Sequence, residues 1–279
     1  MTTTIGGPPA RTRERGPLIR RQSAWTRVTH WVWAVCMFFL LLTGLQIFGA
    51  RPNLYVGQQS GFGFENDVLA IGARANADAE LRGVTRLFGR EFDTTGWLGV
   101  VDGESQTFPS WATIPSYHDL GTGRVIHFFF AWILVGTLLT WLVASLANGH
   151  WRQLLIRGRD LRALPRDVLD HLRLRFHHTR EYNVLQKIAY ASVMFVAFPG
   201  IVLTGLSMSP AFNAFAPWLL DVFGGRQTAR TIHFVLMLLF VAFFVVHIVM
   251  VLAAGPINEM RSMITGRYRI DPEGDDHGR

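Results

Sequence analysis

The sequence has only one cysteine, Cys36, among its 279 residues. Because a disulfide needs two thiols, Cys36 cannot form an intramolecular bridge, and the chain has no Cys-x-x-Cys-His string for covalent haem attachment. Cys36 lies inside a long apolar stretch, so we expect it to be a small, buried apolar residue. The shortage of cysteine therefore excludes a fold held together by internal disulfides.

Acidic and basic side chains are absent from four apolar stretches of 21 to 23 residues, at positions 28–50, 125–147, 188–208 and 232–254. A helix of this length crosses roughly 30 Å of hydrocarbon. A soluble helical protein would instead repeat an apolar residue at every third or fourth position. The predicted fold class is an all-α membrane protein, a four-transmembrane-helix bundle with a long outer loop between helices 1 and 2.

Three regions are predicted along the chain: a flexible basic N-terminus at 1–22, a four-helix domain at 23–268 and a disordered tail at 269–279. The expected helices cover about 26–50, 122–147, 184–208 and 229–254. The outer loop 51–121 is rich in glycine and aromatic residues, which favours short ordered elements over a linker. A short interfacial helix is expected between 210 and 230, and an amphipathic helix in the inner loop 150–185.

The net charge of +7 is distributed unevenly. Residues 1–30 hold six Arg and one Glu, residues 148–187 hold nine basic and four acidic residues, and residues 51–119 hold five Arg and nine acids. Basic excess on alternate segments is typical of the positive-inside rule. We therefore predict cytoplasmic termini, an outer loop at 51–121 and contact with membrane lipid, not with nucleic acid.

Four histidines lie in the apolar stretches, where an ionisable side chain is seldom tolerated without a partner: His30, His127, His233 and His247. Because successive helices run in opposite directions, His127 and His233 fall near the outer surface, and His30 and His247 near the inner one. His233 and His247 are 14 positions apart, so they share one helix face and lie roughly 21 Å apart along it. The last helix thus contributes one histidine to each of two pairs.

Two neutral imidazoles on facing helices are what a b-type haem with two histidine ligands needs. Three of the histidines follow an arginine by three positions, and at the membrane boundary such a side chain can pair with haem propionates: Arg27, Arg124 and Arg230. We predict two haem b groups, held by His127 with His233 and by His30 with His247. Zinc or copper transport is the competing site chemistry, but it favours carboxylates or thiolates, and the spans lack them apart from Cys36.

The string Leu-Thr-Gly-Leu occurs twice, at 42–45 and at 203–206. A helix face without a side chain lets a flat group approach the backbone, although close helix packing explains the repeat about as well. At the start of the third apolar stretch, Asn183, Gln186 and Lys187 offer donors and acceptors to the two carbonyls of a quinone. Helix capping by Asn183 and a snorkelling Lys187 explain these residues equally well.

Taken together, these motifs resemble the bacterial cytochrome b561-like superfamily, which includes the gamma subunits of formate dehydrogenase and the cytochromes b of nickel-iron hydrogenases. The resemblance covers about residues 20–268 and is strongest to the thiosulfate reductase cytochrome b type. It rests on Arg27-x-x-His30, Arg124-x-x-His127, Tyr182-Asn183, Gln186-Lys187, His233, His247, Ser209-Pro210, residues 221–233 and residues 262–268.

The resemblance implies a di-haem electron conduit in the bacterial inner membrane, with the outer haem on His127 and His233 and the inner haem on His30 and His247. It also implies a quinone site at Asn183, with Gln186 and Lys187 as neighbours. The partner that it implies is a periplasmic, molybdopterin-dependent oxidoreductase. Two alternatives stay open: a stand-alone superoxide:quinone oxidoreductase with an outer cationic patch near Arg124 and Arg230, and a transition-metal transporter.

Overall fold

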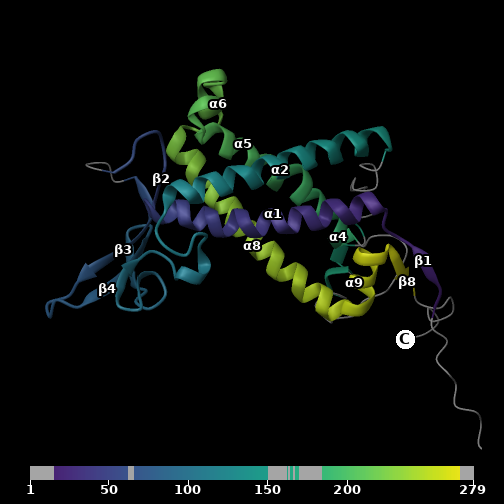
Figure 1. Cartoon of the computed structure of the whole chain (residues 1–279), viewed down its shortest axis with the longest axis horizontal. Helices are drawn as coiled ribbons and strands as arrows, with labels where there is room; N and C mark the ends of the chain where they lie inside the picture. The colour runs from purple at the N-terminus through teal and green to yellow at the C-terminus, as the bar shows by residue number, and fades with distance from the viewer. Residues whose placement is uncertain are drawn as a thin grey trace, which may run out of the picture. The chain divides into compact units, whose positions relative to one another are not determined.

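Among the residues that the structure describes, four helices are long and apolar enough to cross a membrane. They are α1 (Ala24–Gly49), α2 (Leu120–Ala147), a third span at Val184–Met208 and α8 (Arg226–Ala254). The structure is a computed structural model, and Figure 1 traces these helices as the longest ribbons. The predicted four-helix membrane fold is confirmed, and the protein is a multi-pass membrane protein.

The described residues are 16–61, 66–149, 162, 164–165, 167–169 and 184–270. The chain divides into two units. The helical unit comprises Val28–Leu155 and Lys187–His247, and the terminal unit comprises Met1–Arg27, Ile156–Gln186 and Ile248–Arg279. Most of the inner loop, where an amphipathic helix was predicted, lies outside the described residues, as do residues 1–15 of the predicted flexible N-terminus and residues 271–279 of the predicted tail.

The third span is interrupted by a wide helical turn. It consists of α4 (Val184–Ser192), the π-helical turn η3 (Val193–Ala197) and α5 (Phe198–Met208). Pro199 has no N–H, so it cannot bond to the carbonyl four residues earlier, and the N–H of Phe198 instead reaches Val193, five residues back. The turn lies beside the buried Phe198, which belongs to the core of the helical unit.

That core is small and apolar. Its buried members are Cys36, Leu134, Phe198 and Phe240, one from each span, and Cys36 is 1% exposed, as its predicted role requires. Outside this core, most apolar side chains of the spans face outward, and only 6% of the most apolar window of α8 is buried. Lipid is the environment that suits such faces, because all backbone hydrogen bonds are satisfied within the helices.

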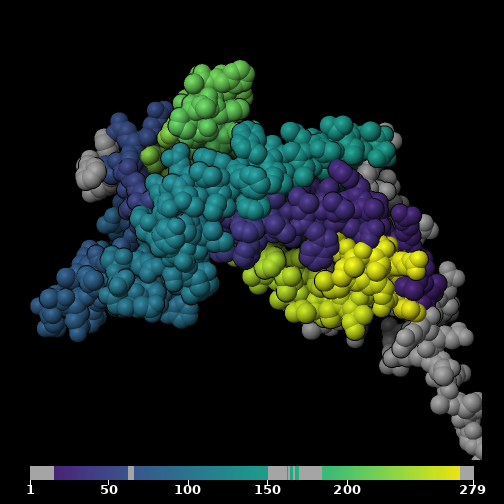
Figure 2. Space-filling model, viewed as in Figure 1, coloured from purple at the N-terminus to yellow at the C-terminus, as the bar shows by residue number. Residues whose placement is uncertain are grey.

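The loop between α1 and α2 contains antiparallel strands, which the sequence did not specify. Strands β2 (Asn53–Tyr55), β3 (Asp67–Ala75), β4 (Leu81–Leu87) and β5 (Arg90–Asp93) form a sheet in that order. Strand β6 (Gly99–Val101) pairs with β7 (Glu104–Gln106), and a single turn, η1 (Ser110–Ala112), follows. Strands β3 and β4 stand off from the rest of the loop as an arm (Figure 2).

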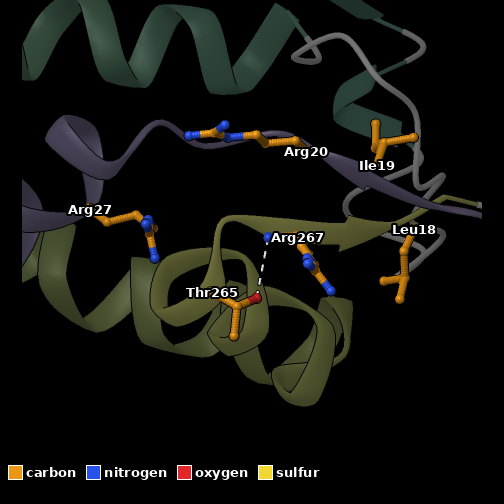
Figure 3. A pocket seen from close by; sticks show the side chains of 6 residues that line it. All are labelled: Leu18, Ile19, Arg20, Arg27, Thr265 and Arg267. Atoms are coloured by element: carbon orange, nitrogen blue, oxygen red, sulfur yellow. Dashed lines mark hydrogen bonds between the residues drawn. The ribbon is translucent and has the colours of Figure 1, made fainter.

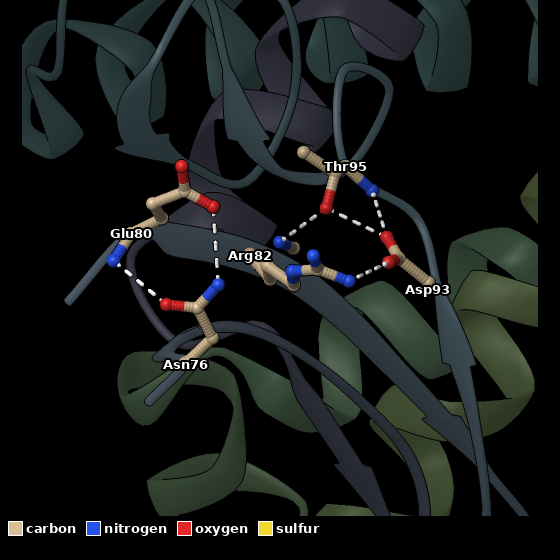
Figure 4. Close-up of polar contacts among 6 residues, drawn as sticks. Asn76, Glu80, Arg82, Asp93 and Thr95 are labelled. Carbon is tan, nitrogen blue, oxygen red and sulfur yellow. Dashed lines mark hydrogen bonds and ion pairs between the residues drawn. The ribbon is translucent and has the colours of Figure 1, made fainter. Parts of the chain in front are cut away.

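Local polar contacts surround the tip of this arm (Figure 4). In the turn, the side-chain oxygen Oδ1 of Asn76 accepts the backbone N–H of Glu80 at 2.9 Å. Beside the turn, Asp93 accepts hydrogen bonds from the hydroxyl and backbone N–H of Thr95, which lower the pKa of that carboxyl, and it pairs with Arg82 of β4 at 3.6 Å. Because these groups are exposed, their contacts set the local conformation of the turn and contribute little to the free energy of unfolding.

Between the third span and α8 the chain forms α6 (Pro210–Phe215) and α7 (Trp218–Val222). The prediction of one interfacial helix over 210–230 is therefore wrong in detail. Pro217 lacks an N–H and disfavours the helical conformation of the residue before it, and Ala216 accordingly has φ −131° and ψ 66°. The helical segment is thus broken, and α8 already begins at Arg226.

In the terminal unit, β1 (Leu18–Arg20) pairs antiparallel with β8 (Arg267–Arg269), which follows α9 (Pro256–Thr265). Residues 18–20 therefore form a strand within the segment predicted to be flexible. Tyr268 is 2% exposed and donates a hydrogen bond to Glu259 at 3.1 Å. Burial and the negative charge of Glu259 raise the pKa of Tyr268 to about 12, so its hydroxyl stays protonated as a donor.

Candidate functional site

His127 in α2 and His233 in α8 are each held by a threonine of another span. The Nδ1 atom of His127 lies 2.9 Å from Oγ1 of Thr43 in α1, and Nδ1 of His233 lies 3.0 Å from Oγ1 of Thr204 in α5. Both threonines have 0% exposure. His127 and His233 lie within electrostatic range of each other. The structure therefore brings this predicted pair together.

The residue after each threonine is a glycine that faces the same histidine. A Cβ atom placed on Gly44 would lie 3.5 Å from Cε1 of His127, and one on Gly205 would lie 3.3 Å from Cε1 of His233. The Leu-Thr-Gly-Leu strings thus have a specific role in this structure, because each forms a seat for an imidazole. The sequence repeat had predicted only room for a flat group beside the backbone, with helix packing as an equal explanation, and it did not identify Thr43 or Thr204 as functional residues.

The second pair, His30 of α1 and His247 of α8, is also brought together. Their ring centroids are 6.3 Å apart and the ring planes are inclined by 55°. Within the described part of the chain, Nδ1 of His30 is buried and has no hydrogen-bond partner. The ring of His247 stacks on Phe243 at 5.8 Å, and His30 meets Trp31 edge-on at 5.3 Å.

The apolar core lies between the two pairs along the helices. Phe240 is seven residues from both His233 and His247 on α8. It packs against Phe198 with ring centroids 4.9 Å apart, and Phe198 contacts Trp33 at 5.8 Å. The described residues contain no group of three or more His, Cys, Asp or Glu side chains placed to hold a metal ion. Each histidine pair therefore resembles a two-ligand site, as an iron inside a macrocycle needs, more than a closed site for a bare metal ion.

Comparison with known proteins agrees with this geometry. The family model of prokaryotic cytochrome b561 matches residues 21–266. The chain belongs to this family. It is also 28% identical, over 234 residues, to a protein from Azospira oryzae named putative protein-methionine-sulfoxide reductase subunit YedZ1, and the match covers 81% of this chain and 87% of that relative.

As a prokaryotic cytochrome b561, the protein is a membrane electron-transfer subunit that binds b-type haem. The histidine pairs fit such a group. Two imidazoles bound to opposite sides of one metal, at about 2 Å each, have centroids roughly 6 Å apart, and His30 and His247 show 6.3 Å. The buried, unpaired nitrogen of His30 and the glycine seats beside His127 and His233 agree with this interpretation.

The three predicted propionate-binding arginines of this cytochrome b561 have different surroundings. Arg230 donates a hydrogen bond to the backbone carbonyl of Arg51 and lies over the ring of Phe48 at 5.5 Å. Arg124 is exposed beside the ring of Phe128, at 5.8 Å. The backbone carbonyl of Arg51 therefore competes with a propionate for Arg230, whereas Arg124 is open to solvent.

Arg27 lies in the terminal unit and donates hydrogen bonds to the backbone carbonyls of Ser23 and Ile264. It lines a cavity of about 440 Å³ (Figure 3). The other lining residues are Leu18, Ile19, Arg20, Thr265 and Arg267. Arg27 is thus partly engaged by backbone, and the cavity that it lines is basic.

The predicted quinone residues are only partly described. Gln186 and Lys187 are half-buried in the first turn of α4, whereas Asn183 lies outside the described residues. The first N–H of α4, that of Val184, bonds to the carboxylate of Asp167 at 2.8 Å. Asp167 therefore accepts the hydrogen bond of a free N–H at the start of α4, whereas one interpretation of the sequence expects Asn183 to cap this helix.

Proposed function

We propose that this cytochrome b561 holds two haems and carries electrons between a periplasmic oxidoreductase and the quinone pool of the bacterial inner membrane. The observation that carries the proposal is the pairing of all four span histidines into two sites that share α8. His127 and His233 would hold one haem, and His30 and His247 the other. Seven residues separate Phe240 from each α8 histidine, so the sites would be roughly 21 Å apart along the helix.

When bound, the two haems would supply the one-electron carriers that connect the two membrane surfaces. The protein side chains do the rest. The histidines would supply neutral nitrogen ligands, and the exposed Arg124, near the start of α2, would provide positive charge for a propionate. Arg230, near the start of α8, would do so through the guanidinium N–H groups that do not bond to the Arg51 carbonyl. The apolar core around Phe198 and Phe240 excludes water between the two sites.

The charge distribution supports the orientation of the electron path. The acidic loop between α1 and α2 and the basic segments at 1–30 and 148–187 favour cytoplasmic termini. In this orientation the His127–His233 pair is near the periplasm and the His30–His247 pair is near the cytoplasm. The partner would then meet the protein on the side of the β3–β4 arm.

A quinone would react beside the His30–His247 pair, with Asn183, Gln186 and Lys187 as its polar neighbours. Lys187 is the only lysine in the chain, and the other basic residues are arginines. Arginine keeps its proton at any physiological pH, whereas lysine can release one when its surroundings favour it. Reduction of a quinone consumes protons, so the single lysine suits a proton donor.

Two considerations support the proposed partner. The relative from Azospira oryzae is named as a reductase subunit, which favours a role as one subunit of a complex. The resemblance of the motifs to the thiosulfate reductase cytochrome b type favours a molybdopterin-dependent partner. Coexpression of the chain with a candidate partner, followed by co-purification, would test the association directly.

The decisive experiment is a pyridine haemochrome spectrum of the purified chain, with haem counted per polypeptide. We expect b-type haem at two per chain and reoxidation of the reduced haem by an added quinone analogue. One haem per chain, or reduced haem that quinone does not oxidise, would contradict the proposal.

A stand-alone superoxide:quinone oxidoreductase is the second candidate, and the exposed Arg124 favours it as a site for an anion. Against it, Arg230 is engaged by the carbonyl of Arg51. Superoxide-driven quinone reduction by the isolated chain, lost in Arg124→Gln, would favour this function. A transition-metal transporter would bind metal without a haem spectrum.

A further inference from the structure

We propose that Thr43 and Thr204 are positioning residues, whose hydroxyls fix the tautomer and orientation of His127 and His233 so that both Nε2 atoms are available to one iron. The inference rests on the proposed di-haem function, because it assigns these histidines to one haem. It adds two residues that neither the family assignment nor the histidine pattern identifies.

The same arrangement occurs twice in different helices. The Thr43 hydroxyl lies 2.6 Å from the carbonyl of Phe39, four residues earlier in α1. The Thr204 hydroxyl lies 2.7 Å from the carbonyl of Gly200, also four residues earlier. Each hydroxyl then meets Nδ1 of a histidine from a following span, and each is followed by the glycine that faces this ring. Two independent occurrences of one geometry indicate a shared role.

The chemistry of the hydroxyl determines the direction of these hydrogen bonds. A carbonyl oxygen only accepts, so the single hydroxyl proton of Thr43 goes to Phe39 and that of Thr204 goes to Gly200. Each threonine oxygen then accepts from its histidine, and the proton of the imidazole must be on Nδ1. Nε2 is left with its lone pair, which is the form that binds a metal.

Thr137 in α2 provides an internal reference for this assignment. Its hydroxyl lies 2.8 Å from the carbonyl of Ile133, four residues earlier, and 3.0 Å from Nε1 of Trp33. An indole nitrogen is only a donor, so the Thr137 oxygen must accept from it while its proton goes to the carbonyl. The same geometry at Thr43 and Thr204 therefore has the same direction.

The two hydroxyls act on the haem through the ligands. A hydrogen-bond acceptor at Nδ1, the ring nitrogen that would not bind iron, makes an imidazole a stronger electron donor and limits its rotation. A stronger donor stabilises oxidised iron relative to reduced iron, so the two threonines lower the reduction potential of the haem at His127 and His233. His30 has no such acceptor at Nδ1 among the described residues, and the haem at the other pair is not affected by these hydroxyls.

The test uses Thr43→Val and Thr204→Val, which keep the shape of the side chain and remove the hydroxyl. Thr43→Ser restores a hydroxyl, and Thr140→Val is the matched control, because Thr140 is exposed and bonds only to Gly136 of its own helix. For each valine variant at 43 or 204 we expect haem affinity at one of the two sites to fall about 10- to 100-fold. The potential of that haem should rise, and its low-spin electron paramagnetic resonance signal should shift.

Thr43→Ser should return all three properties toward those of the native protein, and Thr140→Val should leave them unchanged. Native affinity, potential and resonance signal in both Thr43→Val and Thr204→Val would overturn the inference, while two haems per chain would leave the proposed function intact. Nitrogen-15 spectra of the haem-free chain give an independent readout. Protonation of His127 and His233 at Nδ1 would support the inference, and protonation at Nε2 would overturn it.

Discussion

The two histidine pairs of this cytochrome b561 are built differently. His127 and His233 each have a threonine at Nδ1 and a glycine beside the ring, so the protein itself holds these two imidazoles in place. The His30–His247 pair has aromatic neighbours, and Nδ1 of His30 is buried without a partner in the described region. An unsatisfied buried polar atom costs about 1–3 kcal/mol, so the second pair is the less pre-organised one.

This comparison indicates different tasks for the two ends of the bundle. A site with fixed ligands keeps a haem in one geometry and at one potential. A site in which one imidazole nitrogen lacks an acceptor in the described region is more easily influenced by a neighbouring reactant. The charge pattern of the sequence predicts that the quinone residues are on the same membrane side as His30. Variants at the two pairs should therefore differ in their effects on haem and on quinone reduction.

The largest effect is expected from removing one ligand of each pair. His233→Ala should abolish the haem at the fixed pair, and His247→Ala should abolish the haem at the other pair, because each haem would lose one of its two axial ligands. Redox titration should show two components in the native protein and one in each purified variant, and the missing component should differ between the variants. Loss of both haems in either variant would show that the two sites are not separable.

The next effect concerns Lys187 and is confined to the less fixed end. Lys187→Met should slow quinone reduction by about 100-fold, the usual range for loss of a proton donor, while both haems remain. Lys187→Arg should be as slow as Lys187→Met, because arginine keeps its proton. The measurement is reoxidation of dithionite-reduced haem by a quinone analogue. Native rates in Lys187→Arg would mean that the residue supplies only positive charge.

A smaller effect should distinguish the two glycine seats. A methyl group at position 205 would lie 3.3 Å from the ring of His233, which is tighter than the 3.5 Å at position 44. Gly205→Ala should therefore shift the spectrum and potential of one haem more than Gly44→Ala does. Leucine at either position should displace the ring and reduce haem content at that site. Equal, negligible effects of both leucine variants would show that the glycines serve helix packing alone.

The smallest effect should be that of low pH on the helix cap of α2. Asp119 caps α2, the helix that carries His127, and its carboxylate accepts the N–H of Thr122 at 3.0 Å. This hydrogen bond lowers the pKa of Asp119 below its usual 3.8. The ionised Asp119 therefore contributes its full stabilisation of the α2 N-terminus above pH 3.8, and this stabilisation is lost as the pH falls through the lowered pKa of Asp119.

Thermal loss of haem absorbance from the His127–His233 site, followed between pH 5 and pH 3, should accelerate slightly in the native protein. In Asp119→Ala the loss should be faster at pH 5 and should depend less on pH, because the carboxylate is absent throughout. Asp119→Asn, which also caps helices well, should remain close to the native protein at pH 5. If the rate of haem loss depended on pH in Asp119→Ala as it does in the native protein, the pH dependence would come from groups other than Asp119.

Much of the fold could be predicted from the chain because the membrane imposes strict lengths. The four runs without charged residues predict the spans to within a few residues, and Gly255-Pro256 marks the end of α8. The strands between α1 and α2 could not be predicted in the same way, because most of them are short and they mix apolar, charged and glycine residues without a clear alternation. The π-helical turn before Pro199 could not be predicted either, because a proline without an N–H can also kink or end a helix.

The sequence by itself determined the membrane class, the four span histidines and their division into two pairs, because helix length and periodicity follow from backbone geometry alone. Only the tertiary structure decided what surrounds each imidazole. Thr43 is 84 residues from His127 and Thr204 is 29 residues from His233, and no local pattern relates such distances. The surroundings of each imidazole depend on side chains that meet only when the helices pack, and that packing also makes the pair with threonine partners different from the pair with aromatic neighbours.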